Sequence, residues 1–352
     1  MGADERVGLS VAEMQAATSP AMTSLKAENK ELTRLLERAK AAAGDVSVMM
    51  GDVLSAVQSA ERVKLVSNNT GGKKKVETPS SHVIHLTDLH IGQTTKPEQV
   101  EEMGDFNYAI AIERMQLLGE KILDKTDVQR SGYNIEEAVI LGTGDYISGD
   151  IHPELQFTNE FPAPVQAVKA GYMLGEFAML MARHFKRVRM ELITLDNHGR
   201  LTRKPQASDG GLNNWGYVSA AIAKEYCRNQ PNVTVNVYAQ PCKVIPVGPE
   251  RYLSFHGHQM KGWAGKPYYG FDQRLLKEAL KRMNMRDDVK FTKMIFGHFH
   301  DAVQSGWWTL GGSLSGTDAN DHNQGRYAKP HLTSWFVHDK HGEFDFNKWL
   351  LA

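Results

Sequence analysis

The sequence has few of the features that mark a secreted or polyanion-binding protein. It holds only two cysteines, Cys227 and Cys242, in 352 residues. So few thiols exclude a disulfide framework and a cysteine zinc site, and they fit a reducing compartment. Acidic and basic residues number 41 each. The net charge therefore gives no general attraction to a polyanionic partner, although local patches can still bind one.

Long apolar segments are also missing. No run approaches the ~18 consecutive apolar residues of a membrane span. The N-terminus lacks the basic region and the following apolar region of a signal peptide. Internal repeats and low-complexity tracts are absent as well. We therefore expect no membrane partner and a cytoplasmic location.

The chain does contain 41% hydrophobic and 23% charged residues, which are the values of a globular protein with a sizeable core. Its composition changes twice along the sequence. Residues 1–66 predict a helical arm, and residues 67–80, which are polar, basic and rich in turn formers, predict a linker. Residues 81–352 form the predicted main domain.

The helical arm has the pattern of a short coiled coil. Leu25, Leu32 and Ala39 lie seven residues apart, with charged residues around them. The repeat is shorter than the roughly three to four heptads of a stable coiled coil. Two interpretations therefore stay open: an arm that joins copies of the chain into a homo-oligomer, or a pair of amphipathic helices that packs on its own domain.

From residue 81 onward, strand-like apolar segments alternate with helix-like segments, which predicts a layered α/β domain. The predicted strands are 83–87, 137–142, 188–195, 233–238, 244–247, 252–255, 294–296, 303–310 and 334–346, the last of them folded around a turn at 339–342. The predicted helices are 106–123, 164–185, 213–228 and 271–283.

Five of these strands run into short polar segments that carry potential metal ligands. The segments contain Asp88 and His90, then Asp145, then Asn197 and His198, then His256 and His258, and finally His298 and His300. Sites in open α/β sheets form beyond the carboxyl ends of the strands. Oxygen and imidazole ligands without thiolate suit Mn, Fe, Zn or Ni, and an aspartate that bridges two ions ~3.5–4 Å apart is typical of hydrolytic sites.

In this order the segments resemble the motif series of the calcineurin-like metallophosphoesterases. That series runs Asp-x-His, Gly-Asp, Gly-Asn-His-Asp/Glu, a lone His and Gly-His-x-His. Its counterparts here are Asp88-Leu89-His90, Gly144-Asp145, Asn197-His198, His256 and Gly297-His298-Phe299-His300. The resemblance covers residues 81 to about 313 and implies a four-layer α/β/β/α sandwich with two divalent ions. Manganese is favoured, and iron, zinc and nickel are the alternatives.

The resemblance also implies a role for each residue. One ion would be held by Asp88, His90, Asp145 and His300. The other would be held by Asp145, Asn197, His256 and His298, so that Asp145 bridges the pair. A metal-bridging hydroxide would then attack phosphorus, and His198 would serve the leaving-group oxygen as a general acid or hydrogen-bond donor.

One part of the series departs from the family. Asp196 stands where the family has Gly, and Gly199 stands where it has the acid that orients the histidine. Another group must therefore orient His198, and Asp196 and Asp209 are the candidates. Arg200, just beyond, is predicted to bind phosphate.

Several further residues are candidates for the surroundings of the site. Asp150, His152 and Arg203 are expected to line the substrate pocket, with a turn or a solvated loop as the alternative. His258 is expected beside the ligands of its ion or, alternatively, as one of them. His82 and His85 are expected to be packed or exposed, and not ligands.

For the activity, we predict a phosphodiesterase and, within that class, a nuclease that acts on DNA. The basis is the basic segment after His198, the run Lys73-Lys74-Lys75 and the tryptophans Trp263, Trp307 and Trp308. The motif order is also similar to phage and bacterial members of the DNA-repair exonuclease branch, which implies a bacterial or phage-infected host cytoplasm. The alternatives are a phosphomonoesterase acting on a small molecule or protein, and a non-catalytic metal-binding scaffold.

Overall fold

The computed structural model of the chain describes residues 26–38, 76–151, 155–202, 210–260, 268–323 and 327–352, and the single residues Ser24, Lys40, Lys204 and Gly325. The chain divides into two compact units, Met1–Gly72 and Lys73–Ala352. In the first unit, residues 26–38 are helical. Their leucines, Leu32, Leu35 and Leu36, are 50–59% exposed. The second predicted helix of the arm lies outside the described residues.

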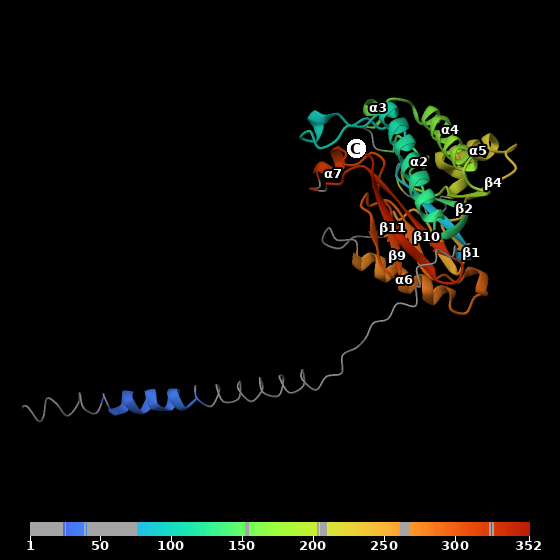
Figure 1. Cartoon of the computed structure of the whole chain (residues 1–352). Helices are drawn as coiled ribbons and strands as arrows, with labels where there is room; N and C mark the ends of the chain where they lie inside the picture. Colours follow the sequence, from blue (N-terminus) through green and yellow to red (C-terminus); the bar gives the residue numbers. More distant parts are fainter. Residues whose placement is uncertain are drawn as a thin grey trace, which may run out of the picture. The chain divides into compact units, whose positions relative to one another are not determined.

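The second unit is built on two β-sheets (Figure 1). The first sheet has six strands in the order β11-β10-β1-β2-β3-β4. Their bounds are β1 (Val76–Leu86), β2 (Tyr133–Gly142), β3 (Arg187–Ile193), β4 (Val233–Tyr238), β10 (His331–His338) and β11 (Gly342–Leu350). Strands β1 to β4 are parallel, whereas β10 and β11 continue the sheet as an antiparallel pair.

The second sheet has five strands in the order β5-β6-β7-β9-β8. Their bounds are β5 (Lys243–Val247), β6 (Glu250–Ser254), β7 (Lys293–Phe296), β8 (Val303–Gln304) and β9 (Trp308–Leu310). Strands β6, β7 and β9 are parallel to one another. The single strand predicted over 303–310 is in fact two short antiparallel strands, because the chain reverses between them.

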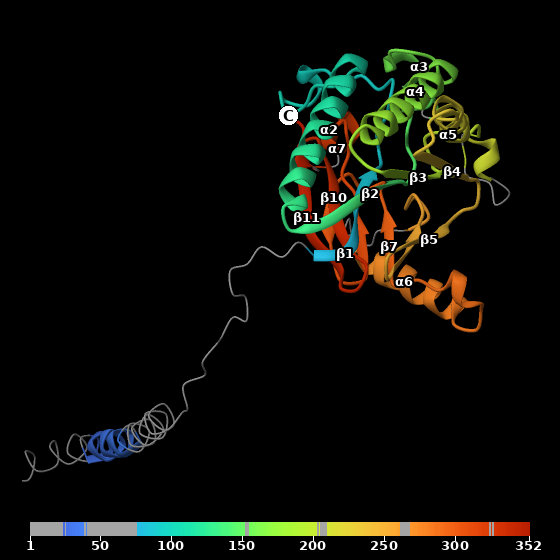
Figure 2. The ribbon, with the colours of Figure 1, turned by 45° about the vertical axis from the view of Figure 1, so that its right-hand side comes forward.

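Helices cover the outer face of each sheet, which completes a four-layer α/β/β/α sandwich (Figure 2). The described helices are α2 (Tyr108–Arg130), α3 (Leu155–Thr158), α4 (Ala163–Ala182), α5 (Trp215–Tyr226), α6 (Tyr268–Arg282) and α7 (Ala319–Asn323). Helices α2, α4 and α5 share one apolar cluster with the first sheet, and Phe271 of α6 packs against the second sheet. The predicted fold class is confirmed.

Alternation along β1 shows how the sequence produces these layers. Successive side chains of a strand point to opposite faces of the sheet. Val83 accordingly lies in the cluster between the two sheets with Tyr252 and Ile295, whereas Ile84 lies in the cluster under the helices. Both residues are fully buried, which explains the continuous apolar run before the first ligand segment.

The predicted linker is wrong at its C-terminal end. Strand β1 begins at Val76, so that 76–80 belong to the sheet. Pro79 and the polar residues around it are typical of a turn, but the pairing with β2 shifts register on both sides of Pro79. A proline, which lacks a backbone N–H, is tolerated at such an irregularity. Among the residues that the structure describes, no helix has both the length and the apolar character to cross a membrane.

Candidate metal centre

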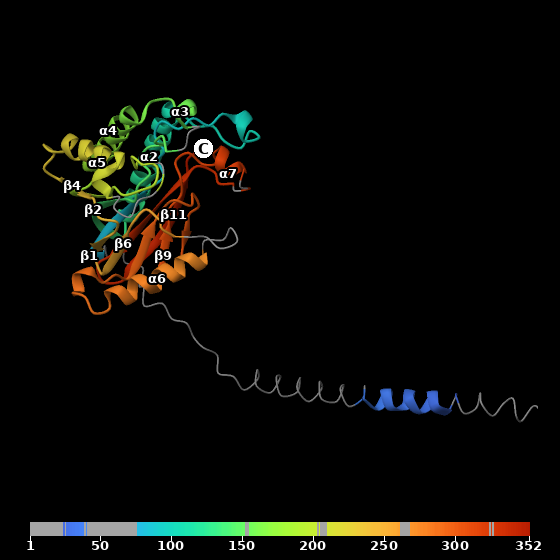
Figure 3. The same ribbon diagram turned by 180° about the vertical axis from the view of Figure 1, so that it is seen from behind.

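The predicted ligand segments follow the carboxyl ends of β1, β2, β3, β6 and β7, which belong to the two sheets of the sandwich (Figure 3). Backbone hydrogen bonds tie neighbouring segments together. The N–H of Asp88 donates to the carbonyl of Gly144 at 3.2 Å, and that of His90 donates to the carbonyl of Asp145 at 3.0 Å. In the second sheet, the N–H of Gly297 donates to the carbonyl of His256 at 2.8 Å. The segments therefore form one connected rim.

The backbone of this rim is held in an unusual conformation. Five of its residues have a positive φ in the left-handed region: Asp88 at 51°, His90 at 46°, Asp145 at 47°, His298 at 75° and His300 at 57°. This conformation costs roughly 1–2 kcal/mol for a residue with a Cβ. Such residues concentrate at functional sites, where the surrounding structure compensates for the cost.

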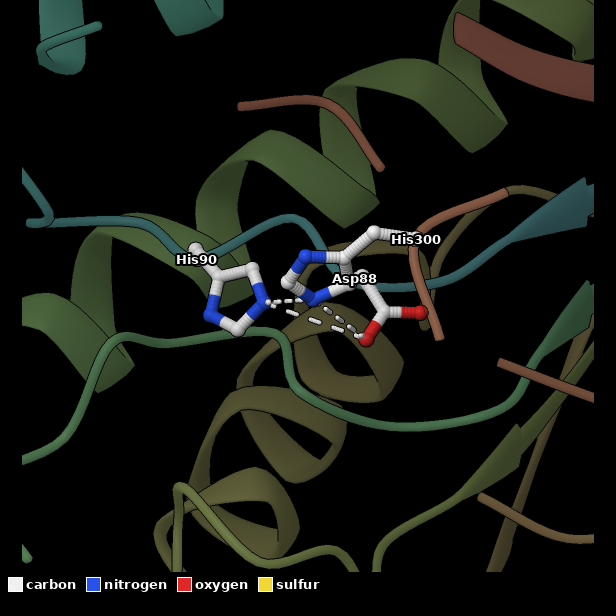
Figure 4. A group of neighbouring side chains, drawn as sticks. All are labelled: Asp88, His90 and His300. Atoms are coloured by element: carbon white, nitrogen blue, oxygen red, sulfur yellow. Dashed lines mark hydrogen bonds and ion pairs between the residues drawn. The ribbon is translucent and has the colours of Figure 1, made fainter. Parts of the chain in front are cut away.

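The first cluster of the site joins Asp88 and His90 to His300, which comes from the other sheet (Figure 4). The Nε2 atoms of the two histidines are 3.1 Å apart. They lie 3.8 Å (His90) and 3.5 Å (His300) from Oδ1 of Asp88. Two imidazole nitrogens that face each other beside a buried carboxylate suit a shared cation.

The second cluster contains Asp145, Asn197, His256 and His298. Nε2 of His256 lies 2.9 Å from Oδ1 of Asn197 and 3.0 Å from Oδ2 of Asp145. Its other ring nitrogen lies 3.0 Å from the carbonyl of Thr143, which accepts the Nδ1 proton. His298 completes the group, with a ligand atom within 4.8 Å of those of Asp145 and His256. Asp145 also lies in a group with His90 and His198, and it therefore stands between the two clusters.

Opposite charges in the clusters shift the pKa values of their members. Burial alone would raise the pKa of Asp88, but hydrogen bonding to His300 and the charge of that residue lower it. Burial would likewise lower the pKa of His256, yet the charge of Asp145 raises it to about 9. Protons thus occupy places between the carboxylates that a cation would take on binding, so metal binding would release protons.

The contacts of His198 turn its ring toward the carboxylate of Asp145. Its Nδ1 lies 2.6 Å from the carbonyl of Ser148, and its backbone N–H donates to Oδ1 of Asp145 at 3.1 Å. Its Nε2 lies 4.0 Å from Oδ2 of Asp145, and the side chain is 20% exposed. The ring therefore presents Nε2 to the site and is reachable from solvent.

The hypothesis that Asp196 orients His198 is wrong. The Asp196 carboxylate instead accepts hydrogen bonds from the backbone N–H of Asp145 and of Gly199, both at 2.8 Å. Asn214 adds a third bond at 3.1 Å. Burial raises the pKa of Asp196 to about 6. This carboxylate therefore shapes the loops of the site, while the carbonyl of Ser148 replaces the missing acid. Asp209 lies outside the described residues.

The remaining candidates are less closely tied to the clusters. The partly buried Arg200 donates from Nε to the carbonyl of Thr202 at 2.9 Å, and Asp150 is exposed. The ring centroid of His258 is 5.6 Å from that of His256, and burial lowers its pKa to about 3. His152, Arg203, Trp263 and Lys73-Lys74-Lys75 lie outside the described residues. Trp308 is a core residue, whereas Trp307 is 65% exposed.

Sequence reasoning missed the groups that support the ligands. The Thr87 hydroxyl donates to Oδ2 of Asp88 at 2.5 Å, and the Oδ2 atom of Asp321 lies 2.9 Å from Nδ1 of His300. Backbone carbonyls such as that of Ser148 leave no sequence signal. Asp321 is 21 positions from its partner, so no local spacing could have linked the two residues.

Comparison with solved structures gives distant likenesses. No family description and no curated protein matches the chain. Among solved structures, it is similar to Vps29 complexed with zinc from Entamoeba histolytica, with 13% identity, a TM-score of 0.27 and coverage of 77% of this chain and 99% of that one. It is also similar to a predicted phosphoesterase from Streptococcus pneumoniae, with 12% identity, a TM-score of 0.26 and coverage of 51% and 90%.

A putative 5'-nucleotidase from Staphylococcus aureus is a third such structure, with 9% identity, a TM-score of 0.29 and coverage of 76% and 53%. TM-scores this low decide nothing by themselves. The layered fold and the ligand clusters at its rim are observed in the structure of this chain itself.

Proposed function

We propose that the chain is a calcineurin-like metallophosphoesterase that uses two divalent ions to hydrolyse phosphodiesters. One observation carries the proposal: Asp145 stands between two buried histidine clusters, and the Nε2 atom of His198 faces the same carboxylate at 4.0 Å. A carboxylate shared by two ions, with an imidazole beside it, fits a two-metal site that stabilises the attacking and leaving oxygens of an in-line displacement at phosphorus.

The donor atoms of the two clusters fit such ions. Asp88, His90 and His300 would hold one ion, Asn197, His256 and His298 would hold the other, and Asp145 would be shared. The clusters offer carboxylate, amide and imidazole donors without thiolate, which suits manganese, iron, zinc or nickel. When bound, the ions would polarise the phosphoryl oxygens and lower the pKa of a water molecule.

The protein itself would position the substrate and move a proton. The carbonyl of Ser148 accepts the Nδ1 proton of His198, so Nε2 is the atom that can donate to a leaving oxygen. A general acid at this position would act through a proton carried on Nε2. A phosphate bound at the rim would thus meet a donor on its solvent-facing side.

We propose a nuclease acting on DNA as the finer assignment. Its support among the described residues is the two basic residues Arg200 and Lys204, which lie two and six positions after His198 in the sequence. Cations beyond the catalytic histidine would neutralise the phosphates that flank the scissile one. The burial of Trp308 removes one of the tryptophans first considered for base stacking, and the exposed Trp307 keeps that role open.

Hydrolysis of model substrates tests the class. With manganese present, the purified chain should hydrolyse bis-(p-nitrophenyl) phosphate faster than p-nitrophenyl phosphate. A reversed preference would assign a phosphomonoesterase, and fewer than one bound ion per chain after manganese supplementation would assign a scaffold. A panel of single-stranded DNA, duplex DNA, RNA and cyclic nucleotides then tests the finer assignment, with Asp145→Asn as the inactive control.

A further inference from the structure

Outside the metal centre, the carboxylate of Asp321 contacts the proposed metal ligand His300 on the side of its ring that faces away from the first cluster. Asp321, in α7, has a side chain that is only 5% exposed, and its Oδ2 lies 2.9 Å from Nδ1 of His300. The other ring nitrogen, Nε2, faces Oδ1 of Asp88 at 3.5 Å and Nε2 of His90 at 3.1 Å. The His300 ring therefore lies between a buried acid and the first cluster.

Helix α7 is itself fixed to the other ligand segment of this cluster. Oδ1 of Asp318 accepts a hydrogen bond from the backbone N–H of Asp321 at 2.8 Å, and its Oδ2 accepts one from Nε2 of Gln93 at 3.0 Å. Gln93 donates its backbone N–H to the carbonyl of His90 at 3.0 Å. These three bonds place Asp321 at a set distance from the segment that carries His90.

We propose that Asp321 is a positioning residue that fixes His300 as a metal ligand. This inference rests on the proposed function, because it needs an ion at the first cluster. A carboxylate that accepts the Nδ1 proton leaves the lone pair on Nε2, directed at Asp88 and His90, and prevents rotation of the ring. It also makes the imidazole a stronger donor to the ion.

A set of three variants tests this role. Asp321→Ala removes the acceptor, whereas Asp321→Asn keeps an amide oxygen but removes the charge. Glu102→Gln is the matched control: it removes an equal charge from an exposed side chain outside the two clusters.

Metal affinity is the first measurement, by calorimetric titration of each metal-free protein with zinc and separately with manganese. The wild type should bind two ions. Asp321→Ala should bind one of them ~10–100-fold more weakly, Asp321→Asn should be intermediate, and Glu102→Gln should match the wild type. Equal affinities in all four proteins would overturn the proposal, as would an equal loss in the control.

The ring proton is the second measurement. Nitrogen-15 NMR of the zinc-loaded wild type should show His300 protonated at Nδ1 and bound through Nε2. Asp321→Asn should lose the slow exchange of that proton, and unchanged exchange would overturn the proposal. If Asp321→Ala fails to give a cooperative thermal melt, Asp321→Asn decides.

A wild type that binds fewer than two ions overturns the proposed function as well, whereas normal wild-type binding with unaffected variants overturns the role of Asp321 alone.

Discussion

At the scale of single residues, a backbone carbonyl performs a task that the related motif gives to an acidic side chain. Ser148 approaches His198 closely because the next residue is Gly149, which has φ of 67°. A Cβ at Gly149 would overlap the carbonyl oxygen of His198. Position 199 therefore lacks the acid of the related motif, and Gly149 allows the Ser148 carbonyl to take its place beside His198. Folding alone brings Gly149 and His198 together.

Replacement of this histidine tests its proposed role. His198→Ala should retain both ions, because the ring belongs to neither of the proposed ligand sets, and should lose ~10²–10⁴-fold in turnover through the missing acid. Metal content and steady-state rates measure the two quantities. The exposed His184, replaced in the same way, is the control. Full activity of His198→Ala would remove His198 from the mechanism.

A second histidine gives a test of stability that does not involve the site. His82 is fully buried, with Nδ1 2.8 Å from the Thr126 hydroxyl and Nε2 2.9 Å from that of Ser334. Burial lowers its pKa to about 3, with smaller contributions from Lys125 and Arg130. Its interpretation as a packed residue and not a ligand agrees with this position.

The sign of the pH effect follows from the lowered pKa. Below ~6.5, the usual pKa of a histidine, the unfolded chain binds a proton at His82 that the folded chain does not bind until about pH 3. His82 should therefore reduce the free energy of unfolding by about 1.4 kcal/mol per pH unit as the pH falls through this window. Urea unfolding of wild type and His82→Gln at several pH values measures the difference in slope, and parallel slopes would contradict it.

At the scale of elements, the sequence predicts the sheet strands and the points where they end, because buried parallel strands are apolar and their ends are polar. Strands β2, β3, β4 and β7 lie where their apolar runs indicate. Contacts between distant segments were beyond prediction. The start of β1 at Val76 depends on pairing with β2, and the link from α7 to His300 depends on how the two sheets meet. The positive φ angles at the rim are also set by the assembled loops.

The glycine before the last ligand pair shows how closely these elements meet. A Cβ at Gly297 would overlap the hydroxyl of Thr87 and the carboxylate of Asp88, which come from the other sheet. Gly297→Ala should therefore displace Asp88, weaken the ion at the first cluster and destabilise the fold by ~1–3 kcal/mol. Gly306→Ala is the matched control, since nothing lies within 4 Å of a Cβ there.

Metal titration and thermal melting of both glycine variants measure these effects. Gly306→Ala should behave as the wild type in both. If Gly297→Ala also bound two ions with unchanged affinity, the close approach of the two sheets at this point would not matter for the site.

At the scale of the whole molecule, the two units differ in what they bury. All three apolar clusters of the described residues are made of residues of the second unit, and their first members are Ile84, Val83 and Leu253. The sandwich therefore supplies its own core. The described helix of the first unit, in contrast, exposes a group of leucines on its surface. A helix with an exposed apolar stripe gains stability by burying that stripe against another element.

Removal of residues 1–72 separates these two properties. The remaining chain should keep its melting temperature, both ions and its turnover, since no residue of the clusters is lost. Its mass by light scattering should fall to that of a monomer, whereas the full chain should be larger, because burial of a leucine between copies stabilises by about 1.5–3 kcal/mol.

Leu32→Glu with Leu35→Glu in the full chain should give the same monomer without the deletion, while Arg34→Glu, on the same helix, controls for the added charge. Equal masses for the full and shortened chains would exclude association through the arm, and loss of the melt on deletion would show that the sandwich needs it to fold.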